Sequence, residues 1–190
     1  MNGQSIGLKE WAVAVKALEE GRQIIVLRKG GISEETRDFR LESPAFFLFP
    51  TFEHQRAELV KEDERAVVAS TQEEAARHPG FFKLTSYAEV AEEIEVTDSA
   101  TLSKLDELHI WTHDYAEERL KWKKTKPLHV LLLRVYKLEE PIELPMREEY
   151  NGCKSWTAFS DELPGRAQTP VLEDEEFAEK VSAVQEALKK

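Results

Sequence analysis

The chain has 190 residues, of which 41% are hydrophobic, and a formal net charge of −11. This length suits one domain with its own core, and the negative charge disfavours bulk attraction to nucleic acid or anionic membranes. The single cysteine excludes an internal disulfide, and neither a secretory signal nor the ~18 apolar residues of a membrane span are visible, so we expect a cytoplasmic protein without membrane contact.

The first predicted element is a helix. Apolar residues recur at helical spacing over residues 8–20, and Gly21 follows as a stop signal. β-Branched residues over 23–27 then predict a strand, which runs into a turn at Gly30 and Gly31.

The strongest strand prediction covers residues 128–138, because this run is almost continuously apolar and is ended by Pro141 and Pro145. The other predicted elements are an extended region over 39–49, a helix from Thr51 through Glu58, a helix over 62–77, extended segments over 81–84 and 88–96, helices capped by Asp98 and Thr112 that run through Leu105 and Trp122, and a final helix over 173–189.

These elements predict an α+β fold, because the helices do not alternate with the strands in a βαβ series. We expect a small mixed β-barrel with inserted helices and a C-terminal helix. The predicted organisation is a single domain over 1–158, a linker-like stretch over 159–172 and the C-terminal helix over 173–190.

Two short motifs place polar chemistry at the ends of predicted strands. Arg28 and Lys29 precede the glycine turn, where backbone N–H groups can approach an anion. Glu53, His54 and Gln55 follow a proline and offer a carboxylate–imidazole pair. The alternative is that the first motif is an ordinary turn with solvated cations and that the second satisfies backbone groups in its turn.

One basic segment interrupts the acidic chain. The stretch from Arg119 to Lys137 holds seven Lys and Arg residues and no Asp or Glu. The cations predicted to hold phosphate are Arg119, Lys121, Lys123, Lys124 and Lys126. Trp111, Trp122 and Trp156 are candidates for stacking a base beside them. The alternative is that the tryptophans belong to the core and the lysines to a solvated loop.

Two obvious enzyme classes lack their signatures. The spaced glutamates of a Nudix-type metal site are missing, and no Asp, Glu or Gln stands two residues before any lysine, as restriction-type nucleases require. His109 and His113 are four residues apart, but the Thr112 cap would place His109 before the helix and off its face. We therefore expect no metal, no cofactor and no catalytic residue.

Several segments together resemble the bacterial family of unknown function DUF1802 over about residues 8–158. They are Trp11, Leu27–Ile32, Pro50–Gln55, Ala88–Val90, His109–Thr112, Leu131–Tyr136 and Tyr150–Trp156. Members of this family are described as sometimes joined to Mrr-type restriction endonuclease domains, which implies a function beside DNA restriction. The segments Ala88–Val96 and Val130–Leu144 are also similar, at the level of fold, to the PUA, ASCH and EVE pseudobarrels, which bind RNA or modified bases.

We therefore expect a non-catalytic module that binds DNA or RNA, or senses a modified base, in connection with DNA restriction. One alternative is a small hydrolase or nuclease of unfamiliar type that uses Arg28, Lys29, Glu53 and His54. The other is a protein-interaction subunit, with a restriction-system protein as a candidate partner. The oligomeric state is open.

Overall fold

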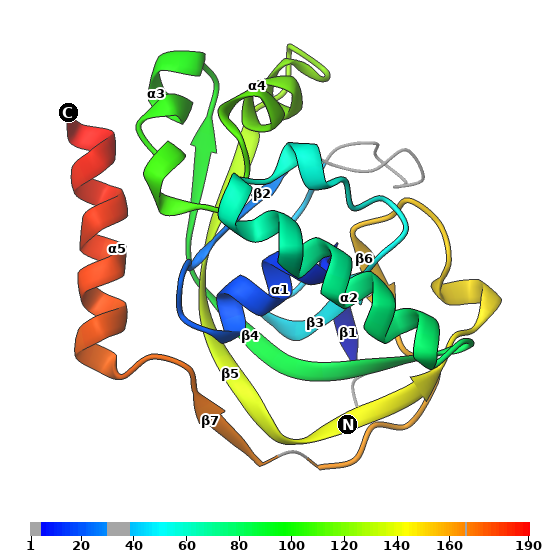
Figure 1. Cartoon of the computed structure of the whole chain (residues 1–190). Helices are drawn as coiled ribbons and strands as arrows, with labels where there is room; N and C mark the ends of the chain where they lie inside the picture. Colours follow the sequence, from blue (N-terminus) through cyan, green and yellow to red (C-terminus); the bar gives the residue numbers. More distant parts are fainter. Residues whose placement is uncertain (1–4, 30–38, 166) are drawn as a thin grey trace.

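The computed structural model describes residues 5–29, 39–165 and 167–190. The predicted turn at Gly30 and Gly31 lies outside the described residues. A seven-stranded mixed sheet forms the centre of the described part, in the order β2-β5-β4-β3-β1-β6, with β7 paired to β5 (Figure 1). The strands are β1 (Ile6–Trp11), β2 (Ile25–Arg28), β3 (Ala45–Thr51), β4 (Phe81–Val96), β5 (Leu128–Pro145), β6 (Trp156–Ala158) and β7 (Gln168–Pro170).

The two longest strands, β4 and β5, run antiparallel and curve around the helices (Figure 1). The strand predicted over 128–138 is confirmed but continues past Pro141. The pairing register with β4 explains how the strand passes this proline. Leu84 pairs with Ile142, whereas Ser86, two residues later, pairs with Lys137, so the register of the ladder shifts between these two pairs. Pro141 therefore sits in an irregular stretch of the β4–β5 ladder, where its missing N–H costs no ladder hydrogen bond.

The N-terminal prediction is wrong for residues 8–11, which belong to β1, and correct for the helix that follows, α1 (Ala12–Glu19). Strand β1 lies between β3, to which it is parallel, and β6, to which it is antiparallel. Most of β1 is buried, so its sequence does not alternate and its apolar residues match a helical spacing by coincidence.

The helix predicted from Thr51 is also wrong. Thr51 ends β3, and its hydroxyl donates to the Glu10 carbonyl at 3.2 Å instead of capping a helix. Only a short 3-10 turn, η1 (Ala57–Leu59), follows. The two later caps are confirmed: the Asp98 carboxylate accepts from the Thr101 N–H, and the Thr112 hydroxyl accepts from the Tyr115 N–H.

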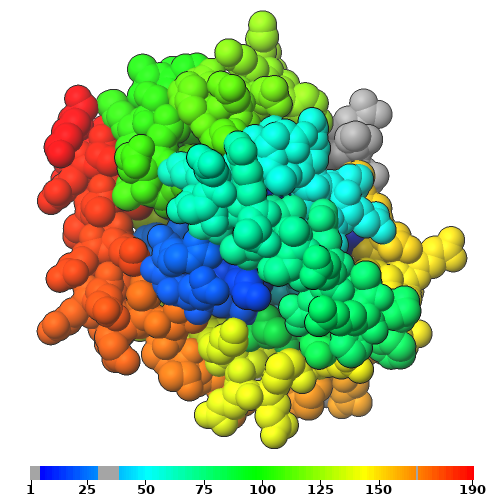
Figure 2. Space-filling model, in the orientation of Figure 1, coloured from blue at the N-terminus to red at the C-terminus, as the bar shows by residue number. Residues whose placement is uncertain are grey.

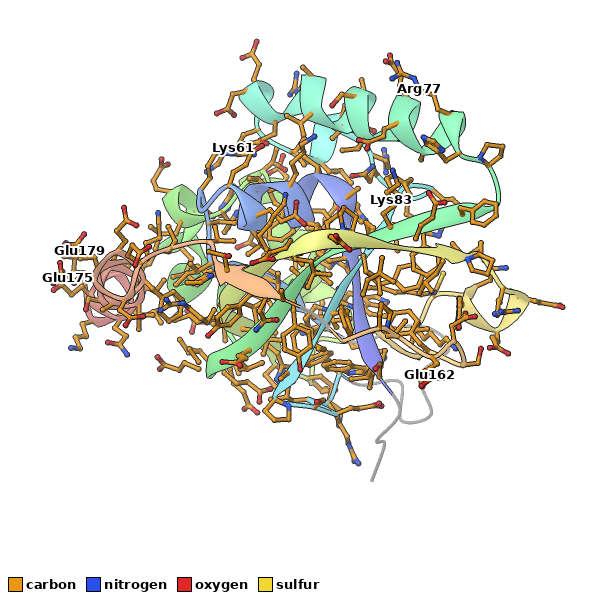
Figure 3. All side chains as sticks on the ribbon, turned by 90° about the horizontal axis from the view of Figure 1, so that it is seen from below. Lys61, Arg77, Lys83, Glu162, Glu175 and Glu179 are labelled. Atoms are coloured by element: carbon orange, nitrogen blue, oxygen red, sulfur yellow. The ribbon has the colours of Figure 1, made fainter. Side chains whose placement is uncertain are left out.

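The remaining helices are α2 (Arg65–Arg77), α3 (Ser99–Ser103), α4 (His113–Lys121) and α5 (Asp174–Lys189), with short 3-10 turns η2 (Glu62–Glu64), η3 (Asp106–Leu108) and η4 (Glu148–Tyr150). Helix α2 covers α1, which in turn covers the sheet (Figures 1 and 2). Helix α5 lies beside the sheet, with Val184 buried against the core and with Glu175 and Glu179 on its outer side (Figure 3).

The predicted α+β class, with a small mixed barrel, inserted helices and a C-terminal helix, is confirmed. Strand β7 falls within the stretch predicted to be linker-like, and the division of the chain at residues 158 and 172 stays a prediction. No helix in the described part of the chain has both the length and the apolar character needed to cross a membrane.

Candidate functional site

A cavity of about 360 Å³ opens where the end of β2, the strand β1 and the loop after η4 meet. Its lining residues come from segments far apart in the sequence: Lys9, Glu10, Trp11, Arg28, Thr51, His54, Arg119, Trp122, Gly152, Cys153, Lys154 and Ser155. We call this cavity the basic pocket. Its volume lies within the range that is usual for small-molecule sites.

Arg28 is fixed in this wall by three contacts. Its Nη1 donates to the Lys9 carbonyl at 3.0 Å and lies 3.4 Å from the Glu10 carboxylate, and its Nη2 donates to the Ser155 hydroxyl at 2.6 Å. Its side chain is only 13% exposed. The guanidinium is therefore held in place before any ligand arrives, which reduces the ordering that binding would require.

The loop after η4 forms a second wall. Gly152 has a φ of 102°, a left-handed conformation that favours glycine, and it precedes Cys153 and Lys154. The Lys9 ammonium holds this loop by donating to the carbonyls of Tyr150 and of Gly152, the latter at 3.0 Å. Burial lowers the pKa of Lys9, and the nearby Lys154 ammonium lowers it by a smaller amount.

The third wall comes from the C-terminal end of α4. The Nε of Arg119 donates to the Tyr115 hydroxyl at 2.9 Å, and its guanidinium lies over the Tyr115 ring. Burial lowers the pKa of Arg119, but Tyr115 and Glu10 outweigh this effect and raise it, so the group stays charged. Trp122 is 37% exposed, and the Lys123 ammonium lies 4.6 Å from the centre of one of its rings.

The structure brings four of the predicted site residues to this pocket: Arg28, His54, Arg119 and Trp122. Glu53 is exposed next to His54. The negative charge of Glu53 raises the pKa of Lys9 and so opposes the effect of burial on that pKa. The two predicted motifs and the basic segment therefore meet at one cavity, which sequence spacing alone could not establish.

Two predicted site residues lie behind the pocket instead of lining it. Lys29 is 1% exposed, and its ammonium donates to the carbonyls of Leu120, at 2.8 Å, and of Lys126. Gln55 is also buried, and its side-chain oxygen accepts from the Val13 N–H at 2.8 Å in the first turn of α1. Both contacts hold elements that carry lining residues.

The other two predicted tryptophans belong to the core. Trp111 is 1% exposed and stacks on Tyr115 at a centroid distance of 5.8 Å. Trp156 is 7% exposed, packs against Phe46 and donates from its indole nitrogen to the Arg40 carbonyl. In this state neither indole face is open to a ligand at the basic pocket.

The predicted phosphate-binding lysines lie on and after the end of α4. Lys121 pairs with Glu117 at 3.2 Å, and Lys123 adopts a left-handed φ of 53° beside Trp122. Lys124 and Lys126 are exposed, and the carbonyl of Lys126 accepts from buried Lys29. The segment continues the positive surface outward from Arg119 and Trp122.

Sequence reasoning missed Lys9, Glu10, Cys153, Lys154 and Ser155. The first two lie on β1, which the sequence pattern presented as a helix. The other three stand in the segment Tyr150–Trp156, which supported the family resemblance but was not considered as a site. The glycine before Cys153 was the signal that could have marked this loop.

A second cavity, of about 240 Å³, lies between α1, α2 and the strands β4 and β5, on the face seen in Figure 2. Its charges are of both signs and partly paired, since Glu19 accepts from Lys137 at 3.0 Å. Lys83 and His78 also line it. We base the functional site on the basic pocket because its cations are in excess over its acids.

Two kinds of comparison connect the chain to known proteins. Its fold is similar to crystal structures of an ASCH protein from Zymomonas mobilis: one has 13% identity over 94% of each chain and a TM-score of 0.50. A point mutant of that protein has 14% identity over 95% of this chain and 98% of the other, with a TM-score of 0.49. The first likeness concerns the fold alone, and it confirms the predicted pseudobarrel.

No curated protein sequence matches the chain. Residues 7–183, however, match the family described as "Domain of unknown function (DUF1802)", a span that reaches from β1 into α5. The resemblance noted from the sequence motifs is thus confirmed over most of the chain, and the protein belongs to the DUF1802 family.

Proposed function

We propose that the protein is a non-catalytic nucleic-acid-binding module and that the basic pocket holds a base together with its phosphate. The observation that carries this proposal is a local reversal of charge. The whole chain has a net charge of −11, yet the lining contains Lys9, Arg28, Arg119 and Lys154 against a single carboxylate, Glu10. That carboxylate is already close to Arg28.

Such a pocket favours an anion for electrostatic reasons. A cavity lined by one sign of charge within low-dielectric walls concentrates the field and attracts the opposite charge. Arginine guanidinium groups match phosphate oxygens in geometry, and lysine ammonium groups add point charges. Since the rest of the surface is mainly acidic, we expect phosphate groups to approach through this opening.

The aromatic groups supply the second half of a nucleotide site. Trp122 presents an exposed indole at the rim, and Trp11 lines the wall at 9% exposure. Stacking of a base on an aromatic side chain contributes about 1–3 kcal/mol and tolerates any base. Beyond Trp122, the exposed Lys124 and Lys126 extend the positive surface along which a single strand can continue.

The proposal is tested by titrating fluorescent single-stranded DNA, single-stranded RNA and duplex DNA at low and moderate salt. Trp122→Ala should weaken binding by about 1–3 kcal/mol. Lys154→Gln should weaken it and reduce the slope of log affinity against log salt by about one. The matched control is Lys83→Gln, which removes the same charge at the second cavity. Absence of binding at low salt, or equal losses in Lys154→Gln and Lys83→Gln, would refute the proposal.

A connection with DNA restriction and recognition of a modified base stay predictions from the family resemblance. The hydrolase alternative stays a prediction as well. It places Lys29 in the chemistry, whereas this lysine donates to two backbone carbonyls behind the pocket. Turnover that is lost in His54→Ala, in a variant that still binds and folds, would favour the enzyme over the binding module.

A further inference from the structure

Two sequence motifs that are far apart meet through a cysteine and a histidine. The Sγ of Cys153 lies 3.9 Å from the Nε2 of His54, although the two residues are 99 positions apart. Both side chains line the basic pocket, and the thiol is exposed. Cys153 is the single cysteine of the chain. Nucleic-acid binding as proposed above requires neither a thiol nor its proximity to an imidazole.

The loop presents this thiol in a defined way. Gly152 turns the chain through its left-handed φ, and Lys9 donates to the Gly152 carbonyl at 3.0 Å. On the other side, the Lys154 ammonium donates to the Glu149 carbonyl at 2.9 Å. The thiol is therefore held at the cavity by hydrogen bonds on both sides of the turn.

The surroundings of the thiol are those of a reactive cysteine. The thiolate, not the thiol, is the nucleophile, and reactive cysteines lie exposed near cations and imidazoles. Here the imidazole of His54 is within reach to accept the thiol proton, while the ammonium groups of Lys9 and Lys154 belong to the same cavity. An anionic reagent would meet these cations, even though the protein as a whole is acidic.

We infer that Cys153 is a thiol-modification site that reacts with small anionic disulfides and that the attached group occupies the basic pocket. The attached group would then exclude nucleic acid from the pocket, a consequence that rests on the function proposed above. In the reaction the Cys153 thiolate attacks one sulfur of the disulfide, forms a new S–S bond and expels the other half as a thiolate. His54 takes the thiol proton and then releases it to solvent or, where the expelled thiolate is basic enough, to that thiolate. Cys153 is oxidised, and the expelled half of the disulfide is reduced.

The first experiment measures rates of thiol–disulfide exchange at pH 7 with a dianionic reagent, dithiobis(nitrobenzoate), and a dicationic one, cystamine. The ratio of the two rates is compared between the folded protein and the same chain unfolded in urea. One unit charge about 6 Å away changes such a rate roughly threefold in water. With two lysines at the cavity, we expect the folded protein to raise the anionic-to-cationic ratio at least about tenfold.

Variants then assign the effect to named groups. His54→Ala should slow both reagents, whereas His78→Ala, at the second cavity, should slow neither. Lys154→Gln should lower the anionic-to-cationic ratio, whereas Lys83→Gln should leave it unchanged. A ratio equal in the folded and unfolded chains would overturn the inference, as would His54→Ala behaving like His78→Ala.

The second experiment tests competition with the proposed ligand. A saturating single-stranded oligonucleotide should protect Cys153 from dithiobis(nitrobenzoate), and the mixed disulfide should weaken oligonucleotide binding until dithiothreitol removes it. Selective reactivity in a protein that binds no oligonucleotide would refute the proposed function and leave the modification site standing. An oligonucleotide that binds without protecting Cys153 would overturn the exclusion and leave binding standing.

Discussion

The buried imidazole of His109 should make the protein sensitive to acid by a predictable amount. Its side chain is fully buried, and its pKa is lowered from 6.5 to about 4, with desolvation as the largest cause. The Lys61 ammonium contributes to this lowering of the pKa, while Asp106, 3.9 Å away, opposes the shift without reversing it. His109 is therefore neutral in the folded protein at any pH well above 4.

The sign and the size of the effect follow from proton uptake. Above pH 6.5 neither the folded nor the unfolded chain protonates His109, so the group does not affect stability. Below pH 6.5 the unfolded chain binds a proton that the folded chain refuses, so the free energy of unfolding decreases as the pH falls. Each unit of pKa difference corresponds to about 1.4 kcal/mol, so the loss approaches about 3 kcal/mol near pH 4.

The assay is urea unfolding of the wild-type protein and of His109→Phe at several pH values between 7.5 and ~4. All other ionisable groups are the same in both proteins, so the difference between the two free energies isolates His109. We expect the variant to gain about 3 kcal/mol relative to the wild type across this range. A difference that does not change with pH would show that the folded protein protonates His109 normally, and the reasoning would be refuted.

Two further substitutions test the supports behind the pocket. Lys29→Met removes the hydrogen bonds to the carbonyls of Leu120 and Lys126 and should cost about 1–3 kcal/mol, with faster amide hydrogen exchange over residues 120–127; unchanged exchange there would contradict this role. Gln55→Leu leaves the buried Val13 N–H without its acceptor and should lower the free energy of unfolding in urea by a similar amount, so a variant of wild-type stability would contradict it.

The fold was predictable from the sequence where the local signals were unambiguous. The apolar run of β5 and the caps Asp98 and Thr112 appear where the sequence placed them. The failure at β1 has a physical cause, because a strand buried between two others lacks the alternation that distinguishes it from a helix. The prediction of a helix capped by Thr51 failed because the Thr51 hydroxyl donates to a carbonyl of the neighbouring strand.

The sequence predicted which segments form the candidate site better than it predicted which of their residues line the cavity. Arg28, His54 and Trp122 reach one cavity, but Lys29 and Gln55, their neighbours in sequence, point their polar atoms into the protein. Residues next to each other at the end of a strand, such as Arg28 and Lys29, face opposite sides, and the sequence does not state which side is the pocket. That choice depends on strand pairings that form only in the folded chain.

The most direct test of the central claim uses the four tryptophan side chains as reporters. A ¹⁵N-labelled protein is titrated with a short single-stranded oligonucleotide at low salt, and the four indole N–H signals are followed by NMR. Trp11 and Trp122 line the basic pocket, whereas Trp111 and Trp156 are buried away from it. We predict that the signals of Trp11 and Trp122 shift with the oligonucleotide concentration and that the other two change little. Unchanged signals at all four indoles, or shifts confined to Trp111 and Trp156, would contradict a nucleic-acid site at the basic pocket.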